Sequence, residues 1–168
     1  NGLREVHANR LLHLDIKPSN IYIRNDATPV LIDFGAARQA LSGDNMLFTP
    51  MYTPGFAAPE QYGQRDRLGP WTDIYAAGAS LYACLVKTPP PPANERMEED
   101  KYQPVSGRLK GQYSEAFLDL VDSMLCLNYL ERPQSVFAVQ KRLLAVAPIA
   151  RPEPPPGLLA QIRDKLTL

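Results

Sequence analysis

His13-Leu14-Asp15-Ile16-Lys17-Pro18-Ser19-Asn20 is the stretch around which the sequence is organised, and Asp33-Phe34-Gly35 follows shortly after it. Two apolar runs, residues 21–23 and 29–32, lie between these stretches and are separated by the polar residues 25–28. The apolar runs predict two short strands, and the polar residues predict the turn of a hairpin. A hairpin at this place would bring the two flanking loops together.

The two loops carry four side chains that suit one kind of chemistry: Asp15, Lys17, Asn20 and Asp33. Hard cations such as magnesium prefer oxygen ligands, whereas phosphate groups are bound by cations and amines. Three oxygen-bearing side chains and one amine at a single place therefore predict a site for a metal ion and a phosphate group.

These residues resemble the catalytic loop and the metal-binding loop of protein kinases, and Lys17 favours the serine/threonine-specific branch. The resemblance implies that Asp15 is the catalytic base, which accepts the proton of the substrate hydroxyl. It implies that Lys17 is also catalytic and binds the transferred phosphoryl group of ATP, and that Asn20 and Asp33 bind Mg²⁺ and, through it, ATP. The family usually has Arg after the His, and this sequence has Leu14 instead.

A later stretch, Thr53-Pro54-Gly55-Phe56-Ala57-Ala58-Pro59-Glu60, resembles the end of a kinase activation segment. The resemblance implies that the Thr53 hydroxyl bridges Asp15 and Lys17. Taken alone, residues 49–59 would be interpreted as a proline-rich loop. Their position after the metal-binding loop, at the separation usual in the family, favours the activation segment.

The resemblance also implies a set of supporting residues. Asp73 would hydrogen-bond the backbone of the catalytic loop, Glu60 would pair with Arg132, and His13 would be a structural support for the loop rather than a general base. Simpler interpretations are a first-turn acid favoured by the helix dipole for Asp73 and a surface arginine for Arg132. His7 is expected to be a packing residue rather than a ligand.

Apolar residues recur at helical spacing over residues 71–86, 114–127 and 135–147, and a short helix is expected within 94–100. The first of these segments is apolar nearly all round, which is typical of a core helix. Ser114 and Ser135 are expected to cap the other two long helices. The predicted fold is mainly α with a small β-hairpin: the C-terminal lobe of the α+β kinase fold, without the N-terminal lobe.

We expect two regions along the chain. Residues 1–147 would form the kinase C-lobe, with the catalytic loop, the activation segment and the helical core. Residues 148–168 would form a proline-rich linker followed by a short amphipathic segment.

Composition limits the other classes of function. The 168 residues carry 18 basic and 18 acidic side chains without a basic block, which argues against nucleic acid as a partner. The longest weakly polar run, residues 74–86, falls short of the ~20 residues that a membrane span needs, so no span and a cytoplasmic location are expected. Cys84 and Cys126 lie in apolar helical patterns and are expected to be buried free thiols.

A kinase also needs a glycine-rich loop over the phosphates, a strand lysine and a helix glutamate, and none of these occurs here. We therefore expect the chain to be the large lobe of a bacterial-type (Hanks-type) serine/threonine kinase. The full-length kinase would transfer the ATP γ-phosphate to a protein Ser or Thr hydroxyl, and the isolated chain would be inactive. The alternative is a pseudokinase-like scaffold or protein-binding module, which Leu14 and the missing small lobe favour.

Two further expectations follow from the same departures. Leu14 has no charge with which to bind a phosphate on the activation segment, so activity should not require phosphorylation of Ser42, Thr49 or Thr53. Apolar side chains near Leu11, Tyr22 and Ile32 should be exposed where the small lobe would lie, and they predict weak self-association of the isolated chain.

Overall fold

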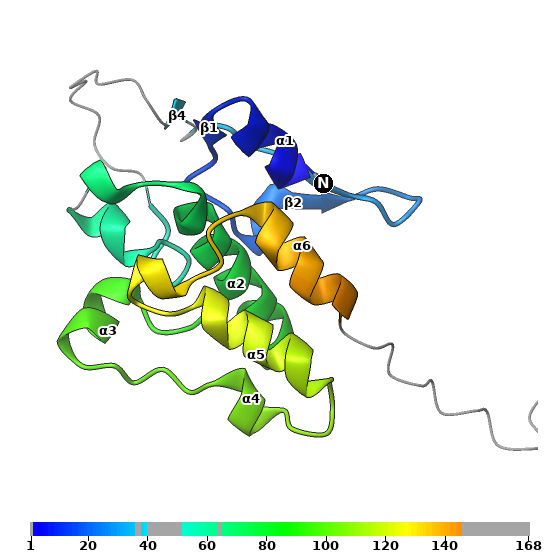
Figure 1. The fold of residues 1–168 in the computed structure, drawn as a ribbon, viewed down its shortest axis with the longest axis vertical. Helices are drawn as coiled ribbons and strands as arrows, with labels where there is room; N and C mark the ends of the chain where they lie inside the picture. The colour runs from blue at the N-terminus through cyan, green and yellow to red at the C-terminus, as the bar shows by residue number, and fades with distance from the viewer. Residues whose placement is uncertain (1, 36–37, 40–51, 64, 146–168) are drawn as a thin grey trace, which may run out of the picture.

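The computed structural model describes residues 2–35, 38–39, 52–63 and 65–145, and its path is drawn in Figure 1. The elements, with short 3-10 helices labelled η, are α1 (Gly2–Ala8), β1 (Leu11–Leu12), η1 (Pro18–Asn20), β2 (Ile21–Ile23), β3 (Pro29–Leu31), β4 (Arg38–Gln39), η2 (Pro59–Tyr62), η3 (Arg65–Arg67), α2 (Pro70–Val86), α3 (Ala93–Glu98), α4 (Val105–Arg108), α5 (Glu115–Met124), η4 (Tyr129–Glu131) and α6 (Val136–Ala145).

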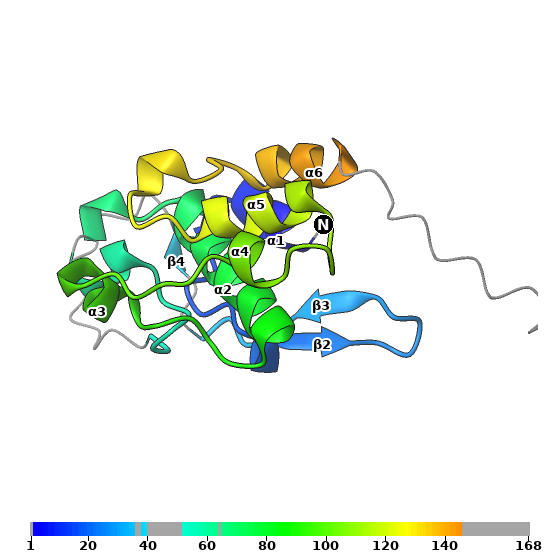
Figure 2. The same cartoon turned by 90° about the horizontal axis from the view of Figure 1, so that it is seen from below.

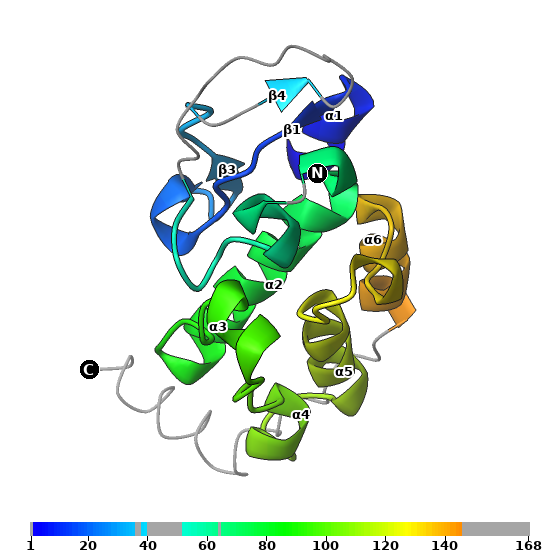
Figure 3. The ribbon, with the colours of Figure 1, turned by 90° about the vertical axis from the view of Figure 1, so that its left-hand side faces the viewer.

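Helix α2 runs through the middle of the molecule. In Figures 1 and 3 it lies between α1 and the strands on one side and α4 and α5 on the other. Every residue from 72 to 76 is buried, which covers more than one full turn, so this part of the helix is enclosed on all sides. The helix begins with Pro70 at its first position, which is where proline is tolerated. It ends at Val86 and is capped by Lys87, which has a left-handed φ of 70°.

Helix α5 packs against α2 and completes the main core. Its buried residues are Leu118, Leu120, Val121 and Met124. The two helices approach closely at Gly78, where a Cβ atom would lie only 2.7 Å from the Cβ of Met124. Glycine at this position of α2 therefore sets the distance between the two helices.

Two small antiparallel pairs of strands flank the catalytic loop. Strands β2 and β3 form a hairpin in which Ile21 faces Leu31 and Ile23 faces Pro29, and Figure 2 shows this hairpin projecting from the helices. Strand β1 pairs with β4, with Leu11 opposite Gln39. The loop that contains Asp15 begins after β1 and ends at η1 and β2, so paired strands hold both of its ends.

Each predicted helix is observed, with ends that differ by a few residues, whereas α4 was not predicted and one of the two predicted caps is wrong. The Ser135 hydroxyl accepts a hydrogen bond from the backbone N–H of Ala138 at 3.2 Å, as predicted. The Ser114 side chain makes no capping bond, and its backbone carbonyl instead accepts from Phe117 and Leu118. Both serines precede their helices, but the rotamer that decides whether the hydroxyl caps is not encoded in the apolar spacing.

The expectation that both cysteines are buried is also wrong. Cys84 is exposed, and Cys126 is only partly buried. Helix α2 is enclosed in its first turns but not near its end, so an apolar pattern that extends to Val86 overestimates burial there. Both thiols are free.

A buried cation that the sequence did not reveal joins three parts of the core. Arg96 of α3 donates to the Tyr75 hydroxyl at 3.1 Å and to the backbone carbonyl of Leu125 at 2.9 Å. Its guanidinium also forms an ion pair with Asp100 at 2.9 Å. The hydrogen bonds that Arg96 donates to this carboxylate lower the pKa of Asp100. A buried arginine is stable only when its donors are satisfied, as they are here.

The predicted fold class is confirmed: the described residues are mostly helical, and strands β2 and β3 form the small hairpin that was expected between the two loops. Residues 146–168 lie outside the described ranges, so the division of the chain near residue 147 stays a prediction. Among the described residues, no helix combines the length and the apolar character that crossing a membrane requires.

The contact at Gly78 gives a prediction about stability. Gly78→Ala should lower the free energy of unfolding by about 1–3 kcal/mol, because the new methyl group overlaps Met124 and the helices must move apart. Urea unfolding followed by circular dichroism measures this change. Gly107→Ala in α4 is the matched control, since nothing lies within 4 Å of a Cβ at that position. Equal effects of the two substitutions would contradict the prediction.

Candidate active site

A buried carboxylate in the first turn of α2 holds the catalytic loop. The two oxygens of Asp73 accept hydrogen bonds from the backbone N–H groups of His13 at 2.9 Å and Leu14 at 2.8 Å. The side chain of His7, expected only to pack, lies 2.8 Å from the same carboxylate. Asp73 is fully buried, so these three contacts replace the water that the carboxylate has lost.

His13 supports the loop from the other side. Its Nε2 lies 3.2 Å from the backbone carbonyl of Ile32, and its Nδ1 lies 3.4 Å from the backbone N–H of Asp15. A carbonyl only accepts and an N–H only donates, so both contacts are satisfied when the ring carries its proton on Nε2. With both ring nitrogens directed at backbone groups, His13 connects the catalytic loop to the residue that precedes Asp33.

Asp15, Lys17 and Thr53 form one polar cluster, although Thr53 lies far along the chain. The Lys17 ammonium lies 2.8 Å from Asp15 Oδ2 and donates to the Thr53 hydroxyl at 2.9 Å. The Thr53 hydroxyl in turn donates to Asp15 Oδ1 at 2.8 Å. Both charged side chains remain partly accessible, with 23% of Lys17 and 17% of Asp15 exposed, so another molecule can reach the cluster.

Asn20 joins this cluster through its amide nitrogen. Nδ2 donates to the Asp15 backbone carbonyl at 2.9 Å and to Asp15 Oδ2 at 3.1 Å. Since the nitrogen faces Asp15, the amide oxygen of Asn20 is the atom that can serve as a ligand. The backbone carbonyl of Asn20 accepts from the N–H of Ile32 at 3.0 Å, which brings the segment that contains Asp33 alongside.

Asp33 is exposed and has a left-handed φ of 62°. Its Oδ1 accepts from the backbone N–H of Gly35 at 3.3 Å. Leu14 is the second residue of these loops in the left-handed region, with a φ of 64°. Such conformations are costly for residues other than glycine and cluster at functional sites, where the surrounding structure maintains them.

The donor set is suitable for magnesium only with help from a ligand. Within the described residues, no group of three or more His, Cys, Asp or Glu side chains could hold a metal ion. Asn20 and Asp33 offer one amide oxygen and one carboxylate. Mg²⁺ requires six oxygens and commonly takes several from phosphate and water, so these two residues fit a metal that arrives bound to a nucleotide.

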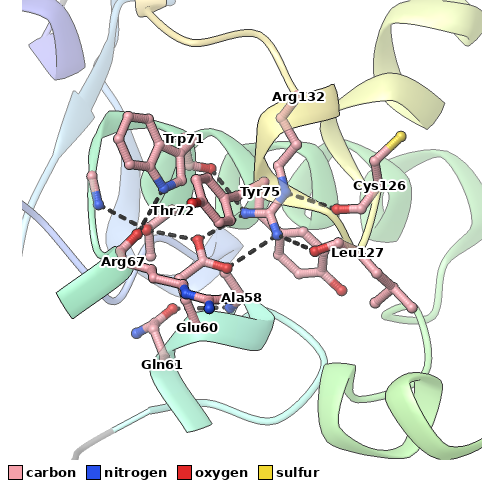
Figure 4. A network of polar contacts seen from close by, with 12 residues as sticks. Ala58, Glu60, Gln61, Arg67, Trp71, Thr72, Tyr75, Cys126, Leu127 and Arg132 are labelled. Atoms are coloured by element: carbon pink, nitrogen blue, oxygen red, sulfur yellow. Dashed lines mark hydrogen bonds and ion pairs between the residues drawn. The ribbon is translucent and has the colours of Figure 1, made fainter. Parts of the chain in front are cut away.

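A buried ion pair fixes the end of the activation segment to the helical core, and Figure 4 shows Glu60 between Thr72 and Arg132. The Arg132 guanidinium donates to both oxygens of Glu60, at 2.9 and 3.1 Å, and both side chains are almost completely buried. Thr72 donates to Glu60 at 2.8 Å. Arg132 also donates to the backbone carbonyls of Cys126 and Leu127, so its other donors are satisfied.

Sequence analysis did not identify Gln61, which connects the same segment to the catalytic loop. Its amide nitrogen donates to the backbone carbonyl of Leu14 at 2.9 Å, and its amide oxygen accepts from the backbone N–H of Ala58 at 2.9 Å. The signal available in the sequence was a glutamine three residues after Ala58, at the start of a short helix, which is the spacing of a capping box.

Two tyrosines near the end of the activation segment, Tyr52 and Tyr62, pack against each other. The rings of Tyr52 and Tyr62 lie 4.5 Å apart, and burial raises the pKa of Tyr62 to about 12. Tyr62 therefore stays neutral at physiological pH.

Of the three phosphorylation positions considered above, Ser42 and Thr49 lie outside the described residues, whereas the Thr53 hydroxyl is hydrogen-bonded to Asp15 and Lys17.

Comparison with known proteins finds similarity to protein kinases. The family described as "Protein kinase domain" matches residues 1–144. Serine/threonine-protein kinase D of Synechocystis sp. is 39% identical over 95 residues, which is 52% of this chain and 18% of that protein. Serine/threonine-protein kinase F of the same organism is 32% identical over 146 residues, or 84% of this chain and 28% of that protein.

A solved structure titled "PpkA-294 apo form" is similar to this one, with a TM-score of 0.71 and 39% sequence identity. The similarity covers 84% of this chain and 49% of that chain. The chain thus spans about half of the solved protein and less than a third of the two curated relatives.

The buried ion pair gives a prediction about stability. Arg132→Met should lower the free energy of unfolding by about 3–5 kcal/mol, because Glu60 would be left as a buried charge without its partner. The control is Lys101→Met, whose pair with Glu99 is mostly exposed and should contribute less than about 1 kcal/mol. Urea unfolding of both variants is the measurement. A loss below 1 kcal/mol for Arg132→Met would show that the pair does not hold the segment.

Proposed function

This chain belongs to the protein kinase domain family, and from that premise we propose that it is the large lobe of a serine/threonine protein kinase. The whole protein would transfer the γ-phosphate of ATP to a Ser or Thr hydroxyl of a protein substrate. A cytoplasmic location and the absence of nucleic-acid partners stay predictions from the sequence.

The single observation that carries this proposal is the cluster of Asp15, Lys17 and Thr53 beside Asn20. A carboxylate that is partly exposed and oriented by two neighbours can accept the proton of a substrate hydroxyl. The Lys17 ammonium, 2.8 Å from this carboxylate, can neutralise negative charge that develops on a phosphoryl group bound beside the pair. The cluster therefore offers a base and a cation to the same reacting centre.

The metal and the nucleotide would be held by the second half of the site. Asn20 and Asp33 would bind Mg²⁺, and Lys17 would contact the phosphate that is transferred. The metal held by these residues would offset negative charge on the phosphate groups. The contact between the Asn20 carbonyl and the Ile32 N–H supports this assignment, because it keeps the two ligand-bearing loops together.

Activity would require a small lobe upstream of this chain. Tyr22, Ile23, Ile32 and Phe34 are between 42% and 57% exposed and would lie on the side that a small lobe covers. Leu11, which was expected to join this surface, is partly buried. Weak self-association of the isolated chain through these side chains stays a prediction, since exposed apolar surface favours association.

The alternative is a pseudokinase-like scaffold. Leu14 supports it, because the residue beside the candidate base lacks the usual positive charge. The two functions differ in a measurable way, since a scaffold would bind partners or nucleotide without transferring phosphate.

The proposal predicts separate effects for two carboxylates in a longer protein with a small lobe upstream of Asn1. Asp15→Asn should lower the rate of phosphate transfer by about 10²–10⁴-fold and leave Mg-ATP binding largely unchanged, because it removes the base. Asp33→Asn should also weaken Mg-dependent nucleotide binding, because it removes a metal ligand. Transfer assays and calorimetric titrations measure the two effects.

Asp119→Asn, at an exposed position of α5, is the matched control and should have no effect on either quantity. The 168-residue chain alone should show no transfer and at best millimolar ATP affinity, about −4 kcal/mol. Near-normal transfer by Asp15→Asn would refute the assignment of the base. Transfer by neither the wild-type longer protein nor any variant would favour the scaffold.

A further inference from the structure

Both backbone groups of Leu14 are held by side chains from other parts of the fold. Its N–H donates to Asp73 of α2 at 2.8 Å, and its carbonyl accepts from Gln61 of η2 at 2.9 Å. Leu14 is buried and has a left-handed φ of 64°, a conformation that costs about 1–2 kcal/mol in an L-residue. The conformation persists because hydrogen bonds on both sides of the residue maintain it.

The two peptide bonds that flank Asp15 are each bound by a side-chain amide. The carbonyl before Asp15, that of Leu14, accepts from Gln61, and the carbonyl of Asp15 itself accepts from Asn20 at 2.9 Å. The orientation of a side chain depends on the peptide planes on either side of its Cα. Gln61 therefore stands in the same relation to the candidate base as Asn20, although it was not among the expected site residues.

The amide oxygen of Gln61 is also hydrogen-bonded. It accepts from the N–H of Ala58 at 2.9 Å, and Ala58 is completely buried. One partner only donates and the other only accepts, so the partners themselves determine which end of the amide carries the nitrogen. The two hydrogen bonds, Ala58 N–H to Gln61 and Gln61 to the Leu14 carbonyl, are called the Gln61 bridge below.

The backbone that carries the Gln61 side chain is itself held in place. The backbone N–H of Gln61 donates to the Ala58 carbonyl at 3.0 Å, and the preceding residue, Glu60, is paired with Arg132 in the core. Figure 4 shows Gln61 beside Ala58 and next to Glu60. A side chain attached to so constrained a segment can fix the position of what it binds.

We propose that Gln61 is a positioning residue, which holds the peptide bond before Asp15 and links the catalytic loop to the end of the activation segment without a charged partner. This inference rests on the proposed function for its effect on catalysis. The contact itself is independent of that function. A glutamine–carbonyl hydrogen bond needs neither a phosphate on the activation segment nor a cation at position 14, so the Gln61 bridge provides a link that is present in the unphosphorylated chain.

Two substitutions separate the halves of the Gln61 bridge. In Gln61→Glu, one carboxylate oxygen can still accept from Ala58, but the other has no proton to donate to the Leu14 carbonyl. In Gln61→Met, a side chain of similar length loses both hydrogen bonds. Gln103→Glu, at an exposed position between α3 and α4, makes the same change of charge away from the loop and serves as the control.

The first measurement is amide hydrogen exchange by NMR on the 168-residue chain, with thermal unfolding to establish that each variant is folded. We expect the Leu14 amide to exchange about tenfold faster in both Gln61 variants, because the loop opens more readily when one of its hydrogen bonds is lost. The Ala58 amide should exchange faster only in Gln61→Met. Unchanged exchange at Leu14 in folded Gln61→Glu would overturn the proposal.

The second measurement is steady-state phosphate transfer by the longer protein that contains a small lobe. In both Gln61 variants kcat should fall about tenfold while KM for ATP changes less than twofold, because the base is misplaced and the metal ligands are not. Faster exchange at Leu14 with an unchanged kcat would overturn the positioning role. A wild-type protein that transfers no phosphate would refute the proposed function, and the exchange rates would still decide whether the Gln61 bridge exists.

Discussion

The buried carboxylate of Asp73 is the interaction on which the geometry of the site depends. A carboxylate without solvent is costly, and here the backbone N–H groups of His13 and Leu14 together with the side chain of His7 offset that cost. The catalytic loop has little regular structure of its own. Its shape is therefore taken from the first turn of α2, and any residue that positions α2 in the core also positions Asp15.

The same turn of α2 organises the activation segment. Thr72, next to Asp73, donates to Glu60, which is in turn paired with Arg132. Two consecutive residues of one helix thus bind the two segments that must meet at the site. Thr53 and Gln61 then join those segments directly, so the site has contacts at its centre as well as at its supports.

The sequence was informative where a pattern reflects burial over several residues. Periodicity identified α2, because a core helix repeats its apolar residues at helical spacing. The β2–β3 hairpin was instead identified from two apolar runs on either side of a polar turn, although Tyr22 and Ile23 are exposed. Periodicity overestimated burial at Cys84, where the helix leaves the core. The grouping of Asp15 with Thr53 came only from the family resemblance, since no local pattern relates positions so far apart. Arg96 and Gln61 were missed because a single polar side chain satisfied by distant backbone groups leaves no periodic trace.

The central claim, that Asp73 determines the conformation of the catalytic loop, is tested most directly by amide hydrogen exchange in the Asp73→Asn chain. Asparagine keeps the shape of the side chain but replaces one acceptor by a donor, so one of the two loop N–H groups loses its partner. We predict faster exchange at His13 and Leu14 and unchanged exchange at Val121, which is buried in α5 and reports on the helical core. Protection of His13 and Leu14 at wild-type levels in the folded variant would contradict the account.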